Sequence, residues 1–545
     1  MSSLLPAARR RPSRGRPALT ATLLAAPLLA GCAARAVPPA SPAATAVAAA
    51  GRATTGTYPK ARVPPEVDIA KARASGRRQL FAWAELNDAA FARARRENRL
   101  VLLHGAAQWC HWCHVMEATT YRDPRVGALL KQHFVTVRVD IDARPDIEER
   151  YDEWGWPATI VLAADGRELG KFRGYMRPDE MLQRLRAALH TRRQSDLPDG
   201  PSEPAITPDN LAWVGALAAL RMDSYYDKKQ GGWGQRQKAP IGANVLFELR
   251  RHRRLGDARA LARAVFSLKQ QAQLIDPVWG GIYQYSAASD WKHPHFEKLM
   301  TYQTANLSAY AQAYRASGDA TLLRHARSIE RYLNTWMSSP GGAFYTTQDA
   351  DVGAHDPKQT FVAGQQYYQL DDRQRRARGI PRIDKHIYAE ENGLAIAALC
   401  DLYQASGDEA VLARAQRAAA TMLHTHVRAN GDVHHRGDAP PTSPAASARK
   451  PLLHLADAAA LGYGFARLAE VGQAPFAAHA RRIADRMLDN FALDGRGGLA
   501  AHTVEARAQG VFAKRRVPYF GTVNAARLLA TLHRLEHRPA DLAAA

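Results

Sequence analysis

Cysteine is scarce in this chain, with only four among 545 residues. So few thiols exclude a small scaffold held together by several disulfides, because such scaffolds need many cysteines in a short chain. Cys110 and Cys113 stand close together, whereas Cys32 and Cys400 are isolated in the sequence. Cys400 lies in an apolar helical stretch, where we expect a small buried hydrophobic residue. The close pair is therefore where cysteine chemistry is expected.

The apolar stretch near the N-terminus, residues 18–30, is too short to be a stable membrane-spanning helix. It follows an arginine-rich segment and leads into Leu-Ala-Gly-Cys ending at Cys32, which resembles a bacterial lipoprotein signal. The resemblance implies cleavage before Cys32 and a lipid anchor on it. We expect residues 1–31 to be a signal peptide and residues 32–75 to be an Ala/Pro-rich tether. An ordinary signal peptide or an uncleaved helix is the alternative.

This signal predicts an extracytoplasmic protein that is lipid-anchored to a bacterial membrane, on the periplasmic face if the source has two membranes. The membrane is then a partner through the N-terminal lipid. Acidic residues are fewer than basic ones, 52 against 74. Many arginines fall within helical periodicities, as at 250–254, which favours a solvated surface over a nucleic-acid-binding patch. We expect no nucleic-acid partner, no cofactor and no metal.

The length of the chain exceeds what one hydrophobic core usually organises, so we expect two folded domains. In residues 76–195, apolar strands alternate with amphipathic helices, with a βαβ unit followed by a hairpin and a helix. Helices are predicted at 87–97, from the cysteine pair onward, at 146–152 and at 178–189, and strands at 100–103, 134–139, 159–163 and near 169–172. This is the order of a thioredoxin-like α/β domain.

Residues 196–540 are almost wholly helical and repeat themselves. Two close copies of one helical segment end in Ser317-Gly318-Asp319 and Ser406-Gly407-Asp408. Glycine ends a helix well and aspartate begins the next one, so each copy predicts a helical hairpin with a tight turn. Gly-Gly turns such as Gly231-Gly232-Trp233 recur between the hairpins. Together these repeats predict an all-α (α/α)6 toroid, with an open solenoid as the alternative.

The segment from Cys110 to His114 carries the clearest chemistry of the chain. Because the pair follows a predicted strand and begins a helix, the sulfur of Cys110 lies where backbone N–H groups stabilise a thiolate. We predict that Cys110 attacks at a helix N-terminus that faces solvent, and that Cys113 resolves the mixed disulfide. A protonated His111 between them would favour the Cys110 thiolate further.

Two neighbouring features support this catalytic assignment. Trp156-Pro157 precedes a predicted strand, at the place where thioredoxin folds present a cis-proline that aligns an extended substrate. His104 ends the strand before the cysteine pair, and we predict that it accepts the proton of Cys113. A buried histidine with only a packing role is the alternative for His104.

Three other uses of the pair stay open. The spacing from Cys110 to His114 also fits covalent haem attachment. His111, His114 and the two cysteines could hold zinc, although the chain has no second cysteine pair. A disulfide without redox function is the third alternative, which so short a loop disfavours.

Several motifs resemble the spermatogenesis-associated thioredoxin-like family, over roughly residues 80–530. They are Trp112-Cys113-His114-Val115-Met116-Glu117, Val137-Arg138-Val139-Asp140, Arg144-Pro145-Asp146, Gly155-Trp156-Pro157, Gly231-Gly232-Trp233-Gly234, Lys238-Ala239-Pro240, Pro294-His295-Phe296-Glu297-Lys298 and Gln348-Asp349-Ala350-Asp351. The resemblance implies an N-terminal thioredoxin-like domain joined to a six-hairpin glycosidase-like toroid. The chain departs from the family at Trp154 and Glu391, where the family's motifs have Gly and Trp.

The toroid offers a possible second site. Toroids of this type often carry carbohydrate chemistry, in which paired carboxylates act as acid and base. Candidate groups lie in or beside the loops between hairpins, and we expect them at one mouth of the ring: His295, Glu297, Asp349, Asp351, Glu390 and Glu391, with Trp279, Tyr283, Trp291 and Tyr345 as aromatics that could stack on a sugar. Helix capping and core packing are the alternatives for these residues.

Two functions follow from these observations. The first is an extracytoplasmic thiol–disulfide oxidoreductase that acts on protein thiols or disulfides, with a toroid that binds clients or a ligand. The alternative is a carbohydrate-active or sugar-binding toroid, glycosidase- or epimerase-like, with an accessory thioredoxin-like domain and a carbohydrate ligand.

Overall fold

The computed structural model describes residues 69–191, 211–356, 358–437, 451–493 and 497–544. From Ile69 onward, the described residues belong to one compact unit. The predicted signal peptide, Cys32 and the tether up to residue 68 lie outside the described residues. Among the helices that are described, none is both long and apolar enough to cross a membrane.

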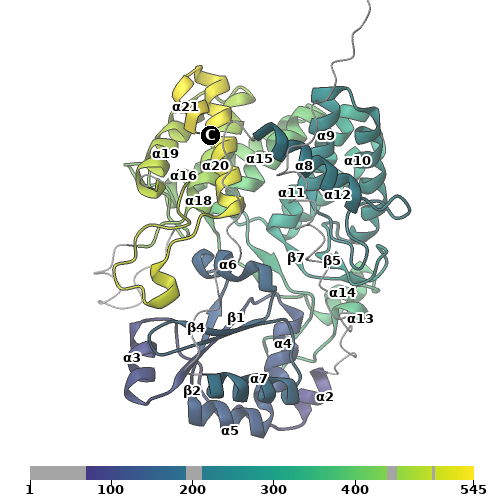
Figure 1. Cartoon of the computed structure of the whole chain (residues 1–545). Helices are drawn as coiled ribbons and strands as arrows, with labels where there is room; N and C mark the ends of the chain where they lie inside the picture. The colour runs from purple at the N-terminus through teal and green to yellow at the C-terminus, as the bar shows by residue number, and fades with distance from the viewer. Residues whose placement is uncertain (1–68, 192–210, 357, 438–450, 494–496, 545) are drawn as a thin grey trace, which may run out of the picture. The chain divides into compact units, whose positions relative to one another are not determined.

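The α/β part is built on a four-stranded sheet in the order β2-β1-β3-β4 (Figure 1). Strand β1 (Leu100–Ala106) runs parallel to β2 (Phe134–Asp140) and antiparallel to β3 (Ala158–Leu162). Strand β4 (Glu168–Arg173) pairs antiparallel with β3. Every residue of β1 is buried, as expected of a central strand covered on both faces. This topology confirms the predicted thioredoxin-like domain.

Helices cover both faces of this sheet. They are α3 (Asp88–Arg96), α4 (His111–Ala118), α5 (Pro124–His133), α6 (Pro145–Tyr151) and α7 (Pro178–His190), with the short α2 (Ile69–Ala74) before them. Residues of α3 and α6 share one core cluster with the sheet, and residues of α4, α5 and α7 share another. Helix α5 is absent from the sequence prediction, although Asp123 caps it and Pro124 begins it.

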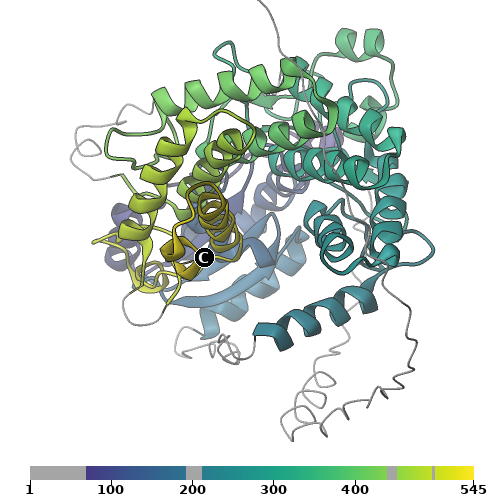
Figure 2. The same cartoon turned by 90° about the horizontal axis from the view of Figure 1, so that it is seen from above.

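The helical part has the (α/α)6 toroid fold. Its longer helices are α8 (Leu211–Tyr225), α9 (Gly242–Leu255), α10 (Ala258–Gln271), α11 (Met300–Ser317), α12 (Ala320–Trp336), α15 (Ala389–Ser406), α16 (Glu409–Thr425), α18 (Leu455–Glu470), α19 (Pro475–Phe491) and α20 (Tyr519–Glu536). Helices α9, α11, α15, α18 and α20 pack on one another in that order, and Figure 2 shows the ring that they follow. Helices α15 and α18 are buried nearly all round, whereas α12 and α19 are amphipathic. Helix α12 packs on α11, and α19 packs on α18.

The hairpin turns follow the predicted capping pattern. Gly256, Gly318 and Gly407 end their helices in the left-handed conformation, which glycine adopts without steric cost. Aspartates 257, 319 and 408 cap the helices that follow. The turn after α18 departs from the pattern, because α19 begins without a side-chain cap.

Glycine also sets how closely the inner helices approach. A Cβ atom on Gly393 of α15 would lie 2.3 Å from the backbone carbon of Ala460 in α18. Gly464 of α18 meets the backbone of Gly393 in the same way. Gly393 and Gly464 therefore form a close packing contact between two inner helices.

Short strands and helices lie in the loops between the hairpins. Strand β5 (Tyr285–Ser286) pairs with β6 (Pro294–His295), and β8 (Thr347–Gln348) pairs with both β7 (Lys298–Leu299) and β9 (Ile383–Asp384). The remaining short helices are α13 (Gly364–Tyr367), α14 (Asp372–Arg378) and the terminal α21 (Pro539–Ala544). The β7–β8 pairing brings together loop residues that are about fifty positions apart in the chain.

Candidate functional site

Cys110 and Cys113 form a disulfide at the start of α4. Cys110 is the N-cap residue of the helix, and its sulfur accepts a hydrogen bond from the Cys113 backbone N–H at 3.1 Å. This is the position at which a helix N-terminus stabilises a thiolate in the reduced protein. The placement agrees with the prediction that Cys110 is the attacking residue.

The surroundings of the disulfide are apolar. Both cysteines belong to a cluster with Trp109 and Ile141, and Trp156 packs against the same cluster. The bond between Trp156 and Pro157 is cis, as predicted from the sequence. Gly105 makes room for Trp156, because a Cβ there would lie 2.5 Å from its ring.

The toroid covers the disulfide. Leu299 of β7 packs against the cysteine cluster, and the His111 backbone N–H donates to Glu297 Oε1 at 3.3 Å. Cys110 is only 3% exposed and Cys113 is fully buried. The prediction that Cys110 faces solvent is therefore wrong, because it considered the thioredoxin-like domain without the loops that pack on it.

His111 forms an ion pair with the toroid at 2.7 Å from its Nδ1 to Asp351 Oδ2. Burial on its own would lower the pKa of His111, but the charge and hydrogen bond of Asp351 outweigh it and raise this pKa to about 9. His111 is therefore a cation at neutral pH. A cation directly after Cys110 favours a thiolate there, as the sequence suggested.

The four toroid residues predicted as a site do come together. Glu297 directly precedes β7, and Asp349 and Asp351 follow its partner β8. His295 stacks on Tyr285, and the centroid of its ring lies 6.2 Å from that of Trp112 in α4. All four therefore gather around the start of α4 rather than in an open mouth of the ring.

Burial and mutual repulsion set the protonation of this group. Burial raises the pKa of Glu297 to about 7. Burial and the charge of Asp351 raise the pKa of Asp349, whereas His111 holds that of Asp351 low against the effect of burial. Burial lowers the pKa of His295 to about 4. The site thus contains one ionised carboxylate, Asp351, which pairs with the imidazolium of His111.

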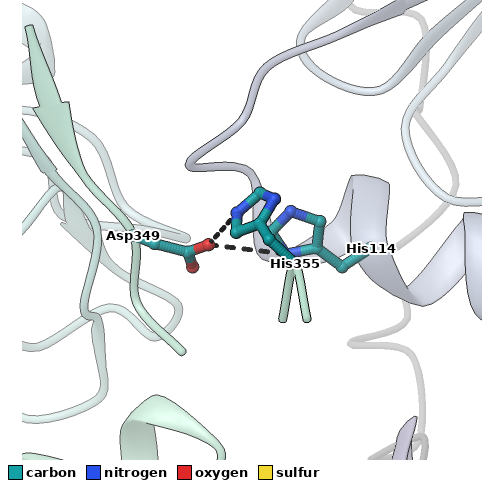
Figure 3. Close-up of side chains that lie close together, drawn as sticks. All are labelled: His114, Asp349 and His355. Atoms are coloured by element: carbon teal, nitrogen blue, oxygen red, sulfur yellow. Dashed lines mark hydrogen bonds and ion pairs between the residues drawn. The ribbon is translucent and has the colours of Figure 1, made fainter. Parts of the chain in front are cut away.

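A second histidine of α4, His114, meets Asp349 and His355 of the toroid (Figure 3). Asp349 Oδ2 lies 2.8 Å from His355 Nε2 and 3.9 Å from His114 Nδ1. Burial lowers the pKa of His114 to about 3, so its ring is neutral. The sequence prediction missed His355, which has no motif around it.

His104 on β1 is fully buried, stacked on Trp83 and within 3.2 Å of the Tyr121 hydroxyl. Burial and the charge of Arg138 lower its pKa to about 3. A base this weak is a poor acceptor for a thiol proton at neutral pH. The structure therefore favours the packing role over the predicted proton-acceptor role.

The aromatics predicted to stack on sugar serve another purpose. Trp279, Tyr283 and Trp291 are buried in a core cluster of the loops. Tyr283 lies against Lys298, whose Nζ is 2.8 Å from Asp276 Oδ2 in a fully buried ion pair. These three rings fill the core of the loop region, so the prediction that they lie exposed at one mouth of the ring is wrong for them. Tyr345 is partly buried against the main core of the toroid.

The α/β part and the toroid meet at a second polar contact beside α6. The ring of His435 donates to the Asp142 carbonyl at 2.8 Å and pairs with Asp457 at 3.0 Å. Burial alone would lower the pKa of His435, but Asp457 raises it to about 9. Glu390 and Glu391, also named from the sequence, begin α15 beside this histidine.

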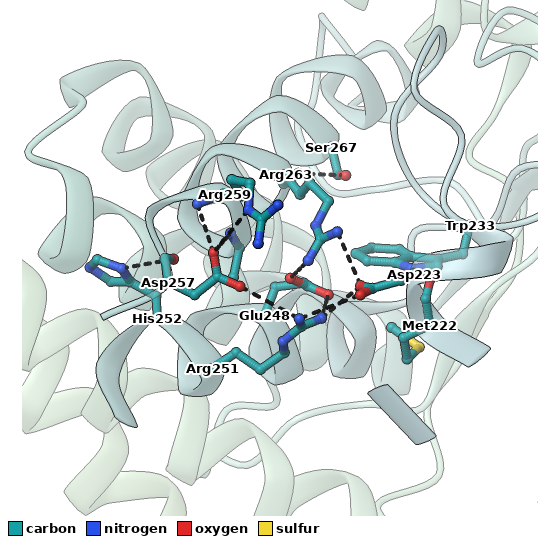
Figure 4. Close-up of polar contacts among 11 residues, drawn as sticks. Met222, Asp223, Trp233, Glu248, Arg251, His252, Asp257, Arg259, Arg263 and Ser267 are labelled. Carbon is teal, nitrogen blue, oxygen red and sulfur yellow. Dashed lines mark hydrogen bonds and ion pairs between the residues drawn. The ribbon is translucent and has the colours of Figure 1, made fainter. Parts of the chain in front are cut away.

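The arginine run at 250–254 is partly engaged within the protein (Figure 4). Arg251 of α9 pairs with Asp223 of α8 at 2.7 Å, and Arg263 of α10 pairs with the buried Glu248 at 2.9 Å. Such ion pairs tie three neighbouring helices together. That the chain has no nucleic-acid partner stays a prediction.

Comparison with known proteins agrees with the resemblance found in the sequence. Residues 75–189 match the family model Thioredox_DsbH, described as a protein of unknown function, DUF255. Spermatogenesis-associated protein 20 of Homo sapiens is 30% identical over 312 residues, which cover 49% of this chain and 39% of the human protein. The same protein of Rattus norvegicus is 30% identical over 313 residues, with 49% and 38% covered.

A shorter match is confined to a quarter of the chain. The thiol:disulfide interchange protein DsbD 1 of Pseudomonas aeruginosa is 31% identical over 137 residues, which cover 24% of this chain and 23% of that protein. The chain thus spans less than half the length of these curated relatives. Among solved structures, a sugar epimerase from a ruminal bacterium is 16% identical, with 60% of this chain and 81% of that chain covered and a TM-score of 0.45.

Proposed function

We propose that this chain is a thiol–disulfide oxidoreductase whose reactive pair is Cys110 and Cys113. The observation that carries the proposal is the position of Cys110 at the N-terminus of α4, where its sulfur accepts a backbone N–H. The cationic His111 next to it adds to the same effect. The sequence similarity to a protein named for thiol:disulfide interchange supports the same chemistry.

The proposed reaction has two exchange steps. The Cys110 thiolate attacks one sulfur of a client disulfide, a mixed disulfide forms, and the other client sulfur leaves as a thiolate that takes up a proton. The Cys113 thiolate then attacks Cys110, which forms the internal disulfide and releases the second client thiolate. The client gains two electrons and the dithiol loses two; the reverse steps oxidise a client dithiol.

The toroid, in this proposal, decides which partner reaches the sulfurs. Leu299 and Glu297 contact the start of α4, so a protein client must displace them before it can lie beside Pro157. Protein thiols or disulfides are the proposed clients. Two of the carboxylates suggested for sugar chemistry, Asp351 and Asp349, are already engaged by His111 and His355, so the geometry supports the oxidoreductase better than a carbohydrate-active toroid.

The test uses the reduced full chain and three cysteine variants. Cys113→Ser should accumulate mixed disulfides with clients that contain a disulfide, because Cys110 can attack that disulfide but nothing resolves the product, and Cys110→Ser should abolish them. Cys400→Ser is the matched control, since Cys400 is buried in α15, and it should behave as wild type. Unreactive Cys110 in the reduced native chain, or haem bound covalently to both cysteines by mass spectrometry, would exclude this function.

We also propose that Cys32 carries a lipid that anchors the protein to the extracytoplasmic side of a bacterial membrane, on the periplasmic face if the source has two membranes. The support is the apolar stretch that ends in Leu-Ala-Gly-Cys. Replacing Cys32 with Ala should release the protein from the membrane fraction. A membrane-bound Cys32→Ala variant with the mass of the wild type would contradict the proposal.

A further inference from the structure

Three side chains outside the redox pair form a compact donor set between α4 and the loop after β8. They are His114, Asp349 and His355, whose ligand atoms all lie within 4.8 Å of one another (Figure 3). Two imidazoles and one carboxylate are a typical ligand set of transition-metal ions in proteins. Calcium and magnesium are disfavoured, because they bind through oxygen ligands.

The spacing of the three donors suits one small ion. Ligands at zinc bond lengths around a tetrahedral ion stand about 3.3 Å apart. Asp349 Oδ2 is 2.8 Å from His355 Nε2 and 3.9 Å from His114 Nδ1, so one edge is shorter and one longer than this value. Small side-chain rotations would even them out. The rings of the two histidines meet edge to face, with centroids 4.8 Å apart, and one nitrogen of each ring lies toward Asp349 Oδ2 (Figure 3).

The burial of His114 is a second observation that points to a bound ion. His114 is 5% exposed, yet neither of its ring nitrogens has a hydrogen-bond partner among the described residues. A buried polar group without a partner destabilises the folded state, so such groups in native proteins usually have a use. Asp349, toward which Nδ1 of this ring is directed, is itself 1% exposed. A cation between them would satisfy both.

We propose that His114, Asp349 and His355 bind a divalent transition-metal ion of the zinc type. The ring of His355 also interacts with the backbone of Gln108, the kind of outer contact that orients a metal-binding histidine. Three protein ligands leave a further position for water. Since His114 belongs to α4 and the other two ligands to the toroid, the ion fastens the helix that carries the cysteines to the loop that covers them.

The test is metal binding to the full chain after removal of bound metal by a chelator. Titration with zinc, followed by calorimetry, should give about one tight site per chain. Cobalt bound at the same site should show the visible absorption of nitrogen and oxygen ligands without a thiolate band. Asp349→Asn, which keeps the side-chain shape, and His355→Ala should each weaken zinc binding at least about 100-fold.

Two controls locate the site. His293→Ala removes an exposed histidine that also pairs with an aspartate, Asp290, at 2.9 Å, and it should leave the tight site intact. Cys110→Ser/Cys113→Ser should bind zinc as the wild type does. The proposal is overturned if the wild type binds no stoichiometric zinc, if His355→Ala binds as tightly as wild type, or if binding is lost with the cysteines.

Thermal unfolding shows whether each variant is folded and whether zinc stabilises it. Zinc should raise the melting temperature of the wild type and of His293→Ala, because a ligand that binds only the folded state stabilises it. Without metal, Asp349→Asn and His355→Ala should melt cooperatively but gain nothing from zinc. An equal rise of the melting temperature with zinc in these variants would also overturn the proposal.

Discussion

Two histidine–aspartate pairs with buried aspartates lie where the α/β part meets the toroid, and they differ in what crosses the boundary. At the dithiol contact, His111 comes from one part and Asp351 from the other, so a full ion pair crosses. At the α6 contact, His435 and Asp457 both belong to the toroid, and only a hydrogen bond to the Asp142 carbonyl crosses. The first pair can therefore influence the cysteines, whereas the second mainly holds the parts together.

The largest expected effect comes from Asp351→Asn. Removing one partner of a buried ion pair typically costs about 3 kcal/mol of unfolding free energy. The pKa of His111 should fall below neutral, because Asp351 is the main group that raises it. Without that cation the thiol pKa of Cys110 should rise, and reaction with a limiting alkylating reagent at pH 7 should slow about tenfold. Urea unfolding and the pH dependence of alkylation measure the two effects; an unchanged alkylation rate would contradict the role of His111.

Asp457→Asn should cost a similar amount of stability without changing the cysteines. His435 loses its buried partner in the same way, so we again expect a loss of about 3 kcal/mol in urea unfolding. The alkylation rate of Cys110 should stay within about twofold of the wild type, because no charge next to α4 changes. If both variants slow alkylation equally, the two contacts are not distinct.

The α6 contact should also be the more alkali-sensitive of the two. Burial raises the pKa of Glu148, Glu390 and Glu391 from the usual 4.5 to about 8, 7 and 8. Between pH 4.5 and these raised pKa values, the folded state binds more protons than the unfolded state. The unfolding free energy should therefore fall as the pH rises through this range. Each group contributes at most about 1.4 kcal/mol per pH unit.

Unfolding in urea from pH 6 to 8.5 measures this slope. Glu391→Gln should flatten it, because one ionising group is removed. Glu297→Gln, at the dithiol contact, removes the group whose pKa is about 7 and serves as the comparison. A slope that neither variant changes would mean that these carboxyl groups do not control the alkaline loss.

The smallest expected effect concerns the link between the contacts. Trp109, next to Cys110, donates its indole N–H to Asp142 Oδ2 at 2.9 Å, and the carbonyl of the same Asp142 accepts from His435. Trp109→Phe should cost about 1 kcal/mol. In a double-mutant cycle with Asp457→Asn, the double variant should lose less unfolding free energy than the sum of the two single losses if the two contacts are coupled.

The sequence was sufficient for most of the fold, because local signals determine it. Alternating strands and helices indicated the thioredoxin-like domain, and the Gly-Asp pairs at 318–319 and 407–408 indicated the hairpins. Helix α5 was missed although its start signal is present at Asp123-Pro124 and its buried residues Val126 and Leu130 have helical spacing.

The site was predictable only in part. The cysteine pair and the cis Pro157 each belong to a short local motif, so the sequence revealed both. The partners of α4 did not follow, because Asp351 is 240 residues from His111 and only the β7–β8 pairing brings Glu297 and Asp349 together. For the same reason, the burial of Cys110 and the role of His355 had no signal along the chain.

The cover of Leu299 over the disulfide has a kinetic consequence. If only an uncovered form reacts, the observed rate is the intrinsic rate multiplied by the fraction of molecules that are uncovered. An uncovered fraction of about 1% would slow a highly reactive thiol about a hundredfold. A molecule that holds the toroid loops apart would then speed the exchange without contacting either sulfur.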